Sequence, residues 1–583
     1  MSAAKTGEAA FNEAYASLNA AQKQAVDTIE GPVMVIAGPG TGKTQILTLR
    51  IANILQQTDA APESILALTF TEAGARAMRA RLISFIGDAA YRVPIHTFHG
   101  FAGELITRYP DAYPRIVGAR IVSEVEQVAA ILTILESATF RRLRPAGAPE
   151  RFVRDILSAI ATLKQEAITP DTFREHVTKQ ATALDALPRY HETGAHKGKE
   201  RRPYLDAKKR LERNQELVVI YQQYEALLRA ERLYDFPDMI VETIRALETN
   251  EEMLRDVEEQ YQYVLADEHQ DVNQSQNRLL ELITGYHAQP NLFVVGDEKQ
   301  AIYRFQGASL DNFLYFEDVF GSTTTIALTD NYRSGQPILD VAHGLIATDD
   351  PQLAPLRVSL QSAVSLPTEV VRRDFAHEAH EEAWLIEAVR AELEAGTPAD
   401  EIAVIVRKNS QVEALAARLR GAGVPVAASA ERDLMQHPTA HAVRALMEAV
   451  TTPSETTLLA VLGAGYWGIA TPDLYRLLAA RKYDRPLFAL ISDRSQLAQV
   501  GVADPEPIMR VHEVIESVRA EQEVRPPHRL LELLLTESGL LEHITRSDPA
   551  ESALIVRRLY DEVTTLVAQR RVTTLADVAR EFS

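Results

Sequence analysis

The apolar residues of the chain gather in short unbroken runs, separated by stretches with helical periodicity. Four such runs are residues 33–37, 65–68, 263–266 and 292–295. Unbroken runs of this length are typical of strands that are buried on both faces of a parallel sheet. After the first run, residues 45–55 carry apolar side chains at helical spacing. This alternation predicts an α/β fold with a parallel sheet.

Long helical stretches interrupt and follow this alternation. Residues 109–228 have helical periodicity without strong strand signals, and so do the residues from 438 onward. Between them the alternating pattern returns, and residues 323–328 predict the start of another sheet. We therefore expect a parallel-sheet core with helical insertions and, at 583 residues, roughly three to five domains.

The first apolar run leads directly into a glycine-rich loop. Gly38, Gly40 and Gly42 are followed by Lys43 and Thr44, where the next helix begins. Strand, glycine loop and helix start make up a phosphate-binding loop, in which backbone N–H groups and the helix N-terminus attract phosphate. Lys43 is expected to reach the β- and γ-phosphates, and the Thr44 hydroxyl is expected to hold Mg²⁺.

Alternatives to a nucleoside triphosphate site fit the loop less well. Ala37 stands where the strict pattern has glycine, but the glycines that cradle the anion come later. A dinucleotide-binding loop is excluded, because Lys43 occupies the position of its third glycine. A glycine-rich turn is the other alternative, and the flanking strand and helix disfavour it.

An acidic pair follows the third apolar run. Asp267 and Glu268 come directly after residues 263–266. Downstream of a phosphate loop, Asp267 would hold Mg²⁺ and Glu268 would polarise the attacking water. Successive residues of a strand point to opposite faces, which suits separate roles. An acidic surface turn is the alternative.

Two glutamines are candidate nucleotide contacts. Gln22 lies upstream of the phosphate loop, on a short helix that Asn19 is expected to cap, and its amide suits the edge of adenine. A solvent-exposed glutamine is the alternative. Gln300 follows the run 292–295 and is able to hydrogen-bond both a γ-phosphate and a water.

Aromatic and basic residues indicate a surface for a further ligand. Phe70 and His99 lie near predicted strand ends, where ligands collect in open parallel sheets, and ordinary core aromatic residues are the alternative. Tyr303 and Phe305 offer two more flat rings. Lysines and arginines cluster between residues 197 and 213, where a phosphate-backbone contact and a solvated helix face are both open.

Composition and charge narrow the class of protein. The absence of cysteine excludes disulfides, iron–sulfur clusters and cysteine-ligated zinc. No apolar run approaches the ~18 residues of a membrane span, and residues 1–10 do not resemble a signal peptide, so we expect a cytoplasmic protein without a membrane partner. The formal net charge of −20 argues against a passive nucleic-acid coat but leaves room for a local basic groove.

Seven segments occur in the order that characterises one helicase family. They are LNAAQ (18–22), GPGTGKT (38–44), TFT (69–71), TFHG (97–100), DEHQD (267–271), VGDEKQAIYRFQG (295–307) and NYRS (331–334). Together they resemble the superfamily 1 UvrD/Rep/PcrA-type DNA helicases. Residues 401–407 continue the match and resemble a strand of the family's second motor domain.

The resemblance implies an ATP-dependent DNA helicase or translocase with RecA-like motor domains of the P-loop NTPase fold and helical insertions. The implied domains are a first motor domain at 1–108 and 230–322, its helical insertion at 109–229, a partial second motor domain at 323–430 and a partial helical accessory domain at 431–583. The implied substrate is single-stranded or tailed duplex DNA, travelled 3′ to 5′ in DNA repair or recombination with partner proteins of those processes.

The resemblance also implies roles for matching residues. Gln22 and Tyr332 would hold adenine, Gln300 would couple the γ-phosphate to DNA, and Arg333 would be an arginine finger reaching across from the second motor domain. The implied catalytic residues are Lys43, Glu268, Gln300 and Arg333. The implied contacts to ATP and Mg²⁺ are Gln22, Gly38, Gly40, Thr41, Gly42, Lys43, Thr44, Asp267, Tyr332 and Arg333. The implied single-strand track is Phe70, His99, Tyr303 and Phe305.

The sequence also departs from the family. Glu72, His269, Ala301 and Phe305 stand where Asn, Phe, Ser and Trp are usual, and GDEKQAIYRFQG is similar to the RecB/AddA branch. Two late family segments, T-x-H-x-x-K-G-L-E and V-A-x-T-R-A, are not found. We therefore expect a C-terminally incomplete motor that binds ATP weakly, hydrolyses it slowly and unwinds nothing alone. The alternatives are a truncated module that binds nucleotide and single strands, and a P-loop ATPase with a protein client.

Overall fold

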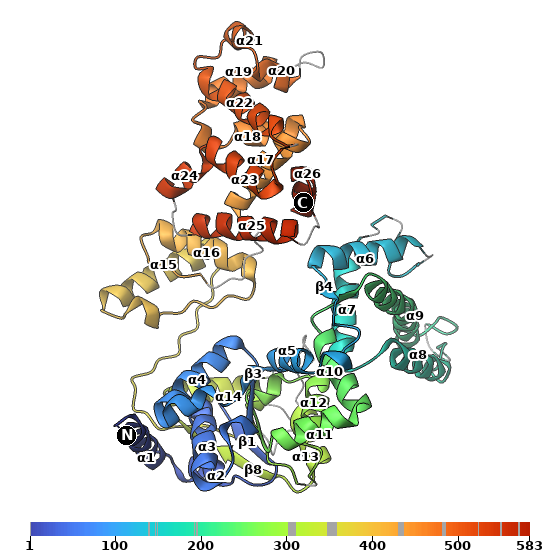
Figure 1. Ribbon diagram of the computed structural model, residues 1–583, viewed down its shortest axis with the longest axis vertical. Coiled ribbons are helices and arrows are strands. Elements are labelled where there is room, and N and C mark those ends of the chain that lie inside the picture. Colours follow the sequence, from blue (N-terminus) through green and yellow to red (C-terminus); the bar gives the residue numbers. More distant parts are fainter. Residues whose placement is uncertain are drawn as a thin grey trace. The chain divides into compact units, whose positions relative to one another are not determined.

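The chain folds into two compact units, Met1–Arg372 and Arg373–Ser583 (Figure 1). The computed structural model describes residues 2–137, 140–145, 147–148, 150–191, 193, 196–287, 289–300, 311–346, 358–428, 437–480, 486–522, 524–547, 551–568 and 572–582. Among these described residues, no helix is both long and apolar enough to span a bilayer.

A six-stranded parallel sheet forms the centre of the first unit. Its strands lie in the order β3 (Ile95–Thr97), β2 (Ile65–Thr69), β6 (Tyr263–Ala266), β7 (Leu292–Gly296), β1 (Val33–Ala37) and β8 (Thr324–Leu328). Val33 pairs with Phe293 on one side and with Thr324 on the other. The predicted α/β fold with a parallel sheet is confirmed.

Helices cover both faces of this sheet, because alternate strand residues enter two separate apolar cores. Val33 and Val35 belong to the core shared with the first four helices, whereas Met34 and Ile36 belong to the opposite core. The first set is α1 (Ser2–Ala16), α2 (Ala20–Asp27), α3 (Lys43–Gln57) and α4 (Glu72–Ile86). The opposite set is α5 (Phe98–Arg108), α10 (Asp238–Thr249), α11 (Glu251–Gln260), α12 (Gln274–Thr284) and α13 (Asp311–Phe320).

The prediction that residues 323–328 begin another sheet is wrong. Thr324–Leu328 is the edge strand of the same sheet, paired along its length with β1. Ile326 and Leu328 are buried in the core beneath α1–α4, so their burial fixes the strand there. The next short strands, β9 (Asp330–Asn331) and β10 (Gln361–Ser362), pair with each other, and α14 (Gln336–Leu345) lies between them in sequence.

A helical insertion leaves the sheet and returns through two paired strands. β4 (Arg120–Ile121) and β5 (Leu233–Tyr234) run parallel to each other. The chain between them forms α6 (Glu124–Ser137), α7 (Val153–Gln165), α8 (Pro170–Asp185) and α9 (Arg202–Ala230), which pack on two apolar cores of their own.

The part of the second unit that the structure describes contains helices and no strand. Its helices are α15 (Glu378–Glu394), α16 (Asn409–Gly421), α17 (Pro438–Thr451), α18 (Glu455–Leu462), α19 (Thr471–Ala480), α20 (Leu487–Ile491), α21 (Arg494–Gln499), α22 (Glu506–Ala520), α23 (Pro527–Glu537), α24 (Leu540–Ser547), α25 (Glu551–Ala568) and α26 (Leu575–Glu581). The strand expected within residues 401–407 is not formed, and the Ile405 side chain there is 92% exposed. Among the described residues, 401–407 have no neighbouring strand with which to form backbone hydrogen bonds, and a strand is not stable without such pairing.

Candidate nucleotide and nucleic-acid site

The loop between β1 and α3 depends on two glycines. Gly40 has φ +73° and Gly42 has φ +91°, in the left-handed region that favours glycine. A Cβ on Gly40 would also lie 2.7 Å from the Cβ of Arg333. Thr41 is fully buried, and its hydroxyl donates to the carbonyl of Gly38 at 2.8 Å. The loop is thereby held in one shape at the N-terminus of α3.

A cavity of about 380 Å³ opens beside this loop. It is lined by Pro39, Gly40, Gly42, Lys43, Thr44, Gln45, Arg81, Glu268, Gln300, Tyr332 and Arg333. Most of these residues were expected from the sequence, but Arg81, on α4, carried no motif that could have found it. Arg333 lines this cavity and belongs to the same compact unit as the loop.

Lys43 and Glu268 form an ion pair across the cavity. The Nζ of Lys43 lies 2.6 Å from the Oε2 of Glu268, which also accepts a hydrogen bond from Gln270 at 2.8 Å. Glu268 has φ +50°, a strained backbone position for a residue with a side chain. The strain and the two contacts fix one carboxylate opposite the lysine that is expected to bind phosphate.

The carboxylates around this pair favour a cation. Burial, followed by the charge of Glu268, raises the pKa of Asp267 to about 7. Burial and Glu268 also raise the pKa of Asp271 to about 6. An opposite charge bound close to these carboxylates would lower both pKa values. Asp267 and the hydroxyl of Thr44 are oxygen donors of the kind that Mg²⁺ prefers, so these residues fit that ion.

Gln22 is buried, so the alternative of an exposed surface glutamine is wrong. It caps α2 reciprocally with Asn19, and its amide nitrogen donates to the carbonyl of Thr41 at 2.8 Å. In this arrangement Gln22 is hydrogen-bonded to the loop and is not among the residues that line the cavity. Asn19 also donates to the hydroxyl of Tyr332 at 3.1 Å, and Tyr332 itself lines the cavity.

Three residues for which the sequence predicts no role connect the predicted site residues. Gln270 accepts from the backbone N–H of Asp297 at 2.8 Å, and the Oδ2 of Asp297 accepts from Gln300 at 2.8 Å. A hydrogen-bonded chain therefore runs from Glu268 to Gln300. Asn331 donates to the carbonyl of Pro39 and accepts the backbone N–H of Arg333 at 2.9 Å. All three lie inside the seven family segments, and this position is the sequence feature that could have identified them.

Phe70 and His99 line a second cavity, of about 260 Å³, close to the ends of β2 and β3. Its wall includes Phe236, whose ring stacks on His99 with centroids 3.9 Å apart and planes at 17°. Phe236 is 53% exposed, and no sequence motif identifies it, because it follows no predicted strand end. Burial lowers the pKa of His99 to about 4, so its ring is neutral at pH 7. Tyr303 and Phe305 lie outside the described residues.

The basic cluster at 197–213 extends into α9, where several of its side chains face solvent. Arg202 is 93% exposed and lies 3.8 Å from Asp206, and Arg213 lies over the ring of Phe152. The exposed cluster fits both alternatives, a phosphate contact and a solvated helix face.

Comparisons with known proteins give one family throughout. A model of the UvrD/REP helicase N-terminal domain matches residues 18–321, and a model of the UvrD-like helicase C-terminal domain matches residues 326–482. The ATP-dependent DNA helicase PcrA of Staphylococcus aureus (strain NCTC 8325 / PS 47) is 25% identical over 96% of this chain and 72% of its own length. That of Staphylococcus epidermidis (strain ATCC 12228 / FDA PCI 1200) is 24% identical over 98% and 74%. The expectation of a C-terminally incomplete chain is not supported by these matches.

Proposed function

The chain belongs to the UvrD/REP helicase family, and from this premise we propose that it moves 3′ to 5′ along single-stranded DNA and unwinds tailed duplexes in DNA repair or recombination. An ATP-dependent DNA helicase is the activity that the family match supports directly. Direction and biological role are proposals that follow the resemblance of the seven segments.

One observation carries the proposal: a nucleotide cavity and an aromatic cavity lie at the same edge of one sheet. The nucleotide cavity follows β1, and the aromatic cavity lies close to the ends of β2 and β3. Ligands of open parallel sheets collect at the carboxyl ends of the strands. An aromatic ring is a platform on which any base can stack, worth ~1–3 kcal/mol per base. Because the nucleotide cavity and the aromatic cavity lie on one sheet, ATP turnover in the first can be coupled to movement of a DNA strand in the second.

We assign the chemistry of the nucleotide cavity residue by residue. Lys43 and the loop backbone bind the β- and γ-phosphates, and Glu268 accepts a proton from the attacking water. Arg333 stabilises charge on the γ-phosphate. Thr44 and Asp267 would hold Mg²⁺, which would neutralise phosphate charge. Gln22, which is hydrogen-bonded to the loop, and Tyr332 hold adenine, and Gln300 couples the γ-phosphate to DNA.

We also propose how the chain divides. The first motor domain takes residues 1–108 and 230–322, with its helical insertion at 109–229. The second motor domain begins at 323 and runs to 430, and residues 431–583 form its helical accessory domain. The edge strand Thr324–Leu328 is then the point where the second motor domain departs from the sheet of the first.

ATP turnover with and without single-stranded DNA tests the proposal, with Phe70→Ala and Phe236→Ala as variants of the track. We expect DNA to raise turnover and each variant to need more DNA for half-maximal stimulation. A protein-client ATPase would ignore DNA. Arrival of the chain at a fluorophore on the 5′ end, and not on the 3′ end, tests the direction.

A further inference from the structure

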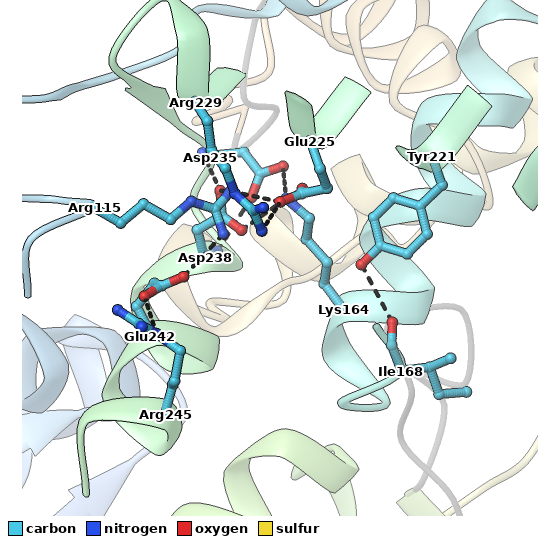
Figure 2. Close-up of polar contacts among 10 residues, drawn as sticks. All are labelled: Arg115, Lys164, Ile168, Tyr221, Glu225, Arg229, Asp235, Asp238, Glu242 and Arg245. Carbon is cyan, nitrogen blue, oxygen red and sulfur yellow. Dashed lines mark hydrogen bonds and ion pairs between the residues drawn. The ribbon is translucent and has the colours of Figure 1, made fainter. Parts of the chain in front are cut away.

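Eight charged side chains form a charge cluster where the helical insertion meets the sheet (Figure 2). It consists of the cations Arg115, Lys164, Arg229 and Arg245 and the carboxylates Glu225, Asp235, Asp238 and Glu242. Lys164 comes from α7 of the insertion, and Asp238 opens α10, which packs on the sheet. The four cations balance the four carboxylates.

Lys164 occupies the centre of the charge cluster. Its Nζ lies 2.6 Å from Glu225, 2.5 Å from Asp235 and 2.7 Å from Asp238, and its side chain is 2% exposed. Burial disfavours the charged amine, but the carboxylates outweigh burial and raise its pKa. Burial would likewise raise the pKa of Asp238, yet Lys164 and Arg115 lower it. Glu225, Asp235 and Asp238 converge as metal ligands would, and the amine fills the place of a cation.

The amine holds both ends of a four-residue turn. The backbone N–H of Asp235 donates to the Oδ2 of Asp238 at 3.0 Å, and that of Asp238 donates to the Oδ1 of Asp235 at 3.1 Å. The remaining oxygen of each carboxylate accepts from Lys164. Phe236 and Pro237 lie between them in sequence. The position of the Phe236 ring on His99 is therefore set by a turn that Lys164 closes.

The same lysine places a second residue of the aromatic cavity. Gln165 follows Lys164 at the end of α7, and it lines the cavity together with Phe236 and Pro237. One buried charge thus contacts two segments that carry cavity residues, and Lys164 and Asp235 are 71 residues apart in sequence.

We propose that Lys164 is a positioning residue for single-stranded DNA: without touching DNA, it holds Phe236 and Gln165 at the aromatic cavity. This inference rests on the proposed function, in which the cavity receives a base. If the charge cluster served only to stabilise the fold, a substitution in it would weaken DNA binding no more than an equally destabilising substitution elsewhere in the core. A positioning residue acts through the ring that it positions.

A double-mutant cycle in the full chain tests this inference. Lys164→Met removes the charge and keeps the length, Phe236→Ala removes the ring, and the third variant carries both. Ile131→Ala, in the fully buried core of the insertion, is the matched control for lost stability. If the Lys164→Met protein does not fold, a triple variant is used in its place. The triple variant combines Lys164→Met with Asp235→Asn and Asp238→Asn, so that no uncompensated carboxylate is left at these two positions. Affinity for a fluorescent oligo-dT and DNA-stimulated turnover are measured for each protein.

We expect Phe236→Ala to weaken oligo-dT binding ~5- to 150-fold, the range for losing one stacked base. Lys164→Met should raise the half-saturating DNA concentration to a similar extent, change turnover at saturating DNA by less than about 2-fold, and add less than about 2-fold in the Phe236→Ala background. Two outcomes would overturn this inference and leave the proposed function intact. In one, the losses of oligo-dT affinity caused by Lys164→Met and Phe236→Ala multiply in the double variant. In the other, Ile131→Ala loses as much affinity as Lys164→Met. Unchanged binding by Phe236→Ala would overturn the proposed track, and the inference with it.

Discussion

Glu268→Gln should separate nucleotide binding from turnover, and it should tighten binding. In the free protein, Glu268 already holds the amine of Lys43 at 2.6 Å, so an incoming phosphate must compete for that amine. The Lys43 side chain is 12% exposed and that of Glu268 is 36% exposed, so solvent screens the pair. A screened pair is worth about 1 kcal/mol, or ~5-fold in affinity. A glutamine keeps the shape and removes the competing charge.

The same substitution removes the group that accepts the proton of the attacking water. Loss of a positioned general base lowers the rate ~10²- to 10⁴-fold. We would measure the affinity for a fluorescent ATP analogue by titration and DNA-stimulated turnover by phosphate release. Lys43→Ala is the control, since it removes the phosphate contact itself and should abolish binding. Weaker nucleotide binding by Glu268→Gln would refute the reasoning, because the carboxylate would then be supporting nucleotide rather than competing with it.

Three further predictions follow from charge, burial and backbone geometry. Neutralising Lys208, Lys209 and Arg210 should flatten the salt dependence of oligo-dT binding if the cluster contacts phosphate, and an unchanged slope would favour a solvated helix face. Because His99 has a pKa of about 4 when folded and 6.5 ordinarily, only the unfolded chain takes up its proton as pH falls below 6.5. Stability should drop by about 1 kcal/mol between pH 7.5 and 5.5, and thermal unfolding of His99→Leu should lack this part of the drop. Gly40→Ala should lose ATP-analogue binding in the same titration, because its φ is +73° and the new Cβ would meet Arg333; parent-like affinity would show that the loop adapts.

The parts of the fold that local patterns determine could be predicted from the sequence. The apolar runs that form β1, β2, β6 and β7 are buried on both faces. Strands buried in this way are apolar at nearly every position, so their composition predicts the parallel sheet. The phosphate loop carries its own signature, because glycine is required where φ is positive. Lys43 and Glu268 meet because each follows a strand at the same sheet edge.

The remaining features depend on contacts between distant segments. The edge strand β8 begins with two exposed threonines, and only its pairing with β1 assigns it to the first sheet. Gln22 resembles a surface residue until the carbonyl of Thr41 is seen to accept from it. Phe236 belongs to no segment of the motif series, and its stacking on His99 exists only because the insertion returns beside the sheet.

Strand displacement by this chain, with ATP and Mg²⁺, tests the central claim most directly. Two duplexes of the same sequence are compared, one with a 3′ single-stranded tail and one with a 5′ tail, and Lys43→Ala serves as the inactive control. We predict ATP-dependent unwinding of the 3′-tailed duplex and little of the 5′-tailed one. Robust unwinding of the 5′-tailed duplex would contradict the proposed direction. DNA-stimulated ATP turnover with neither duplex unwound would contradict the proposed helicase activity of this chain.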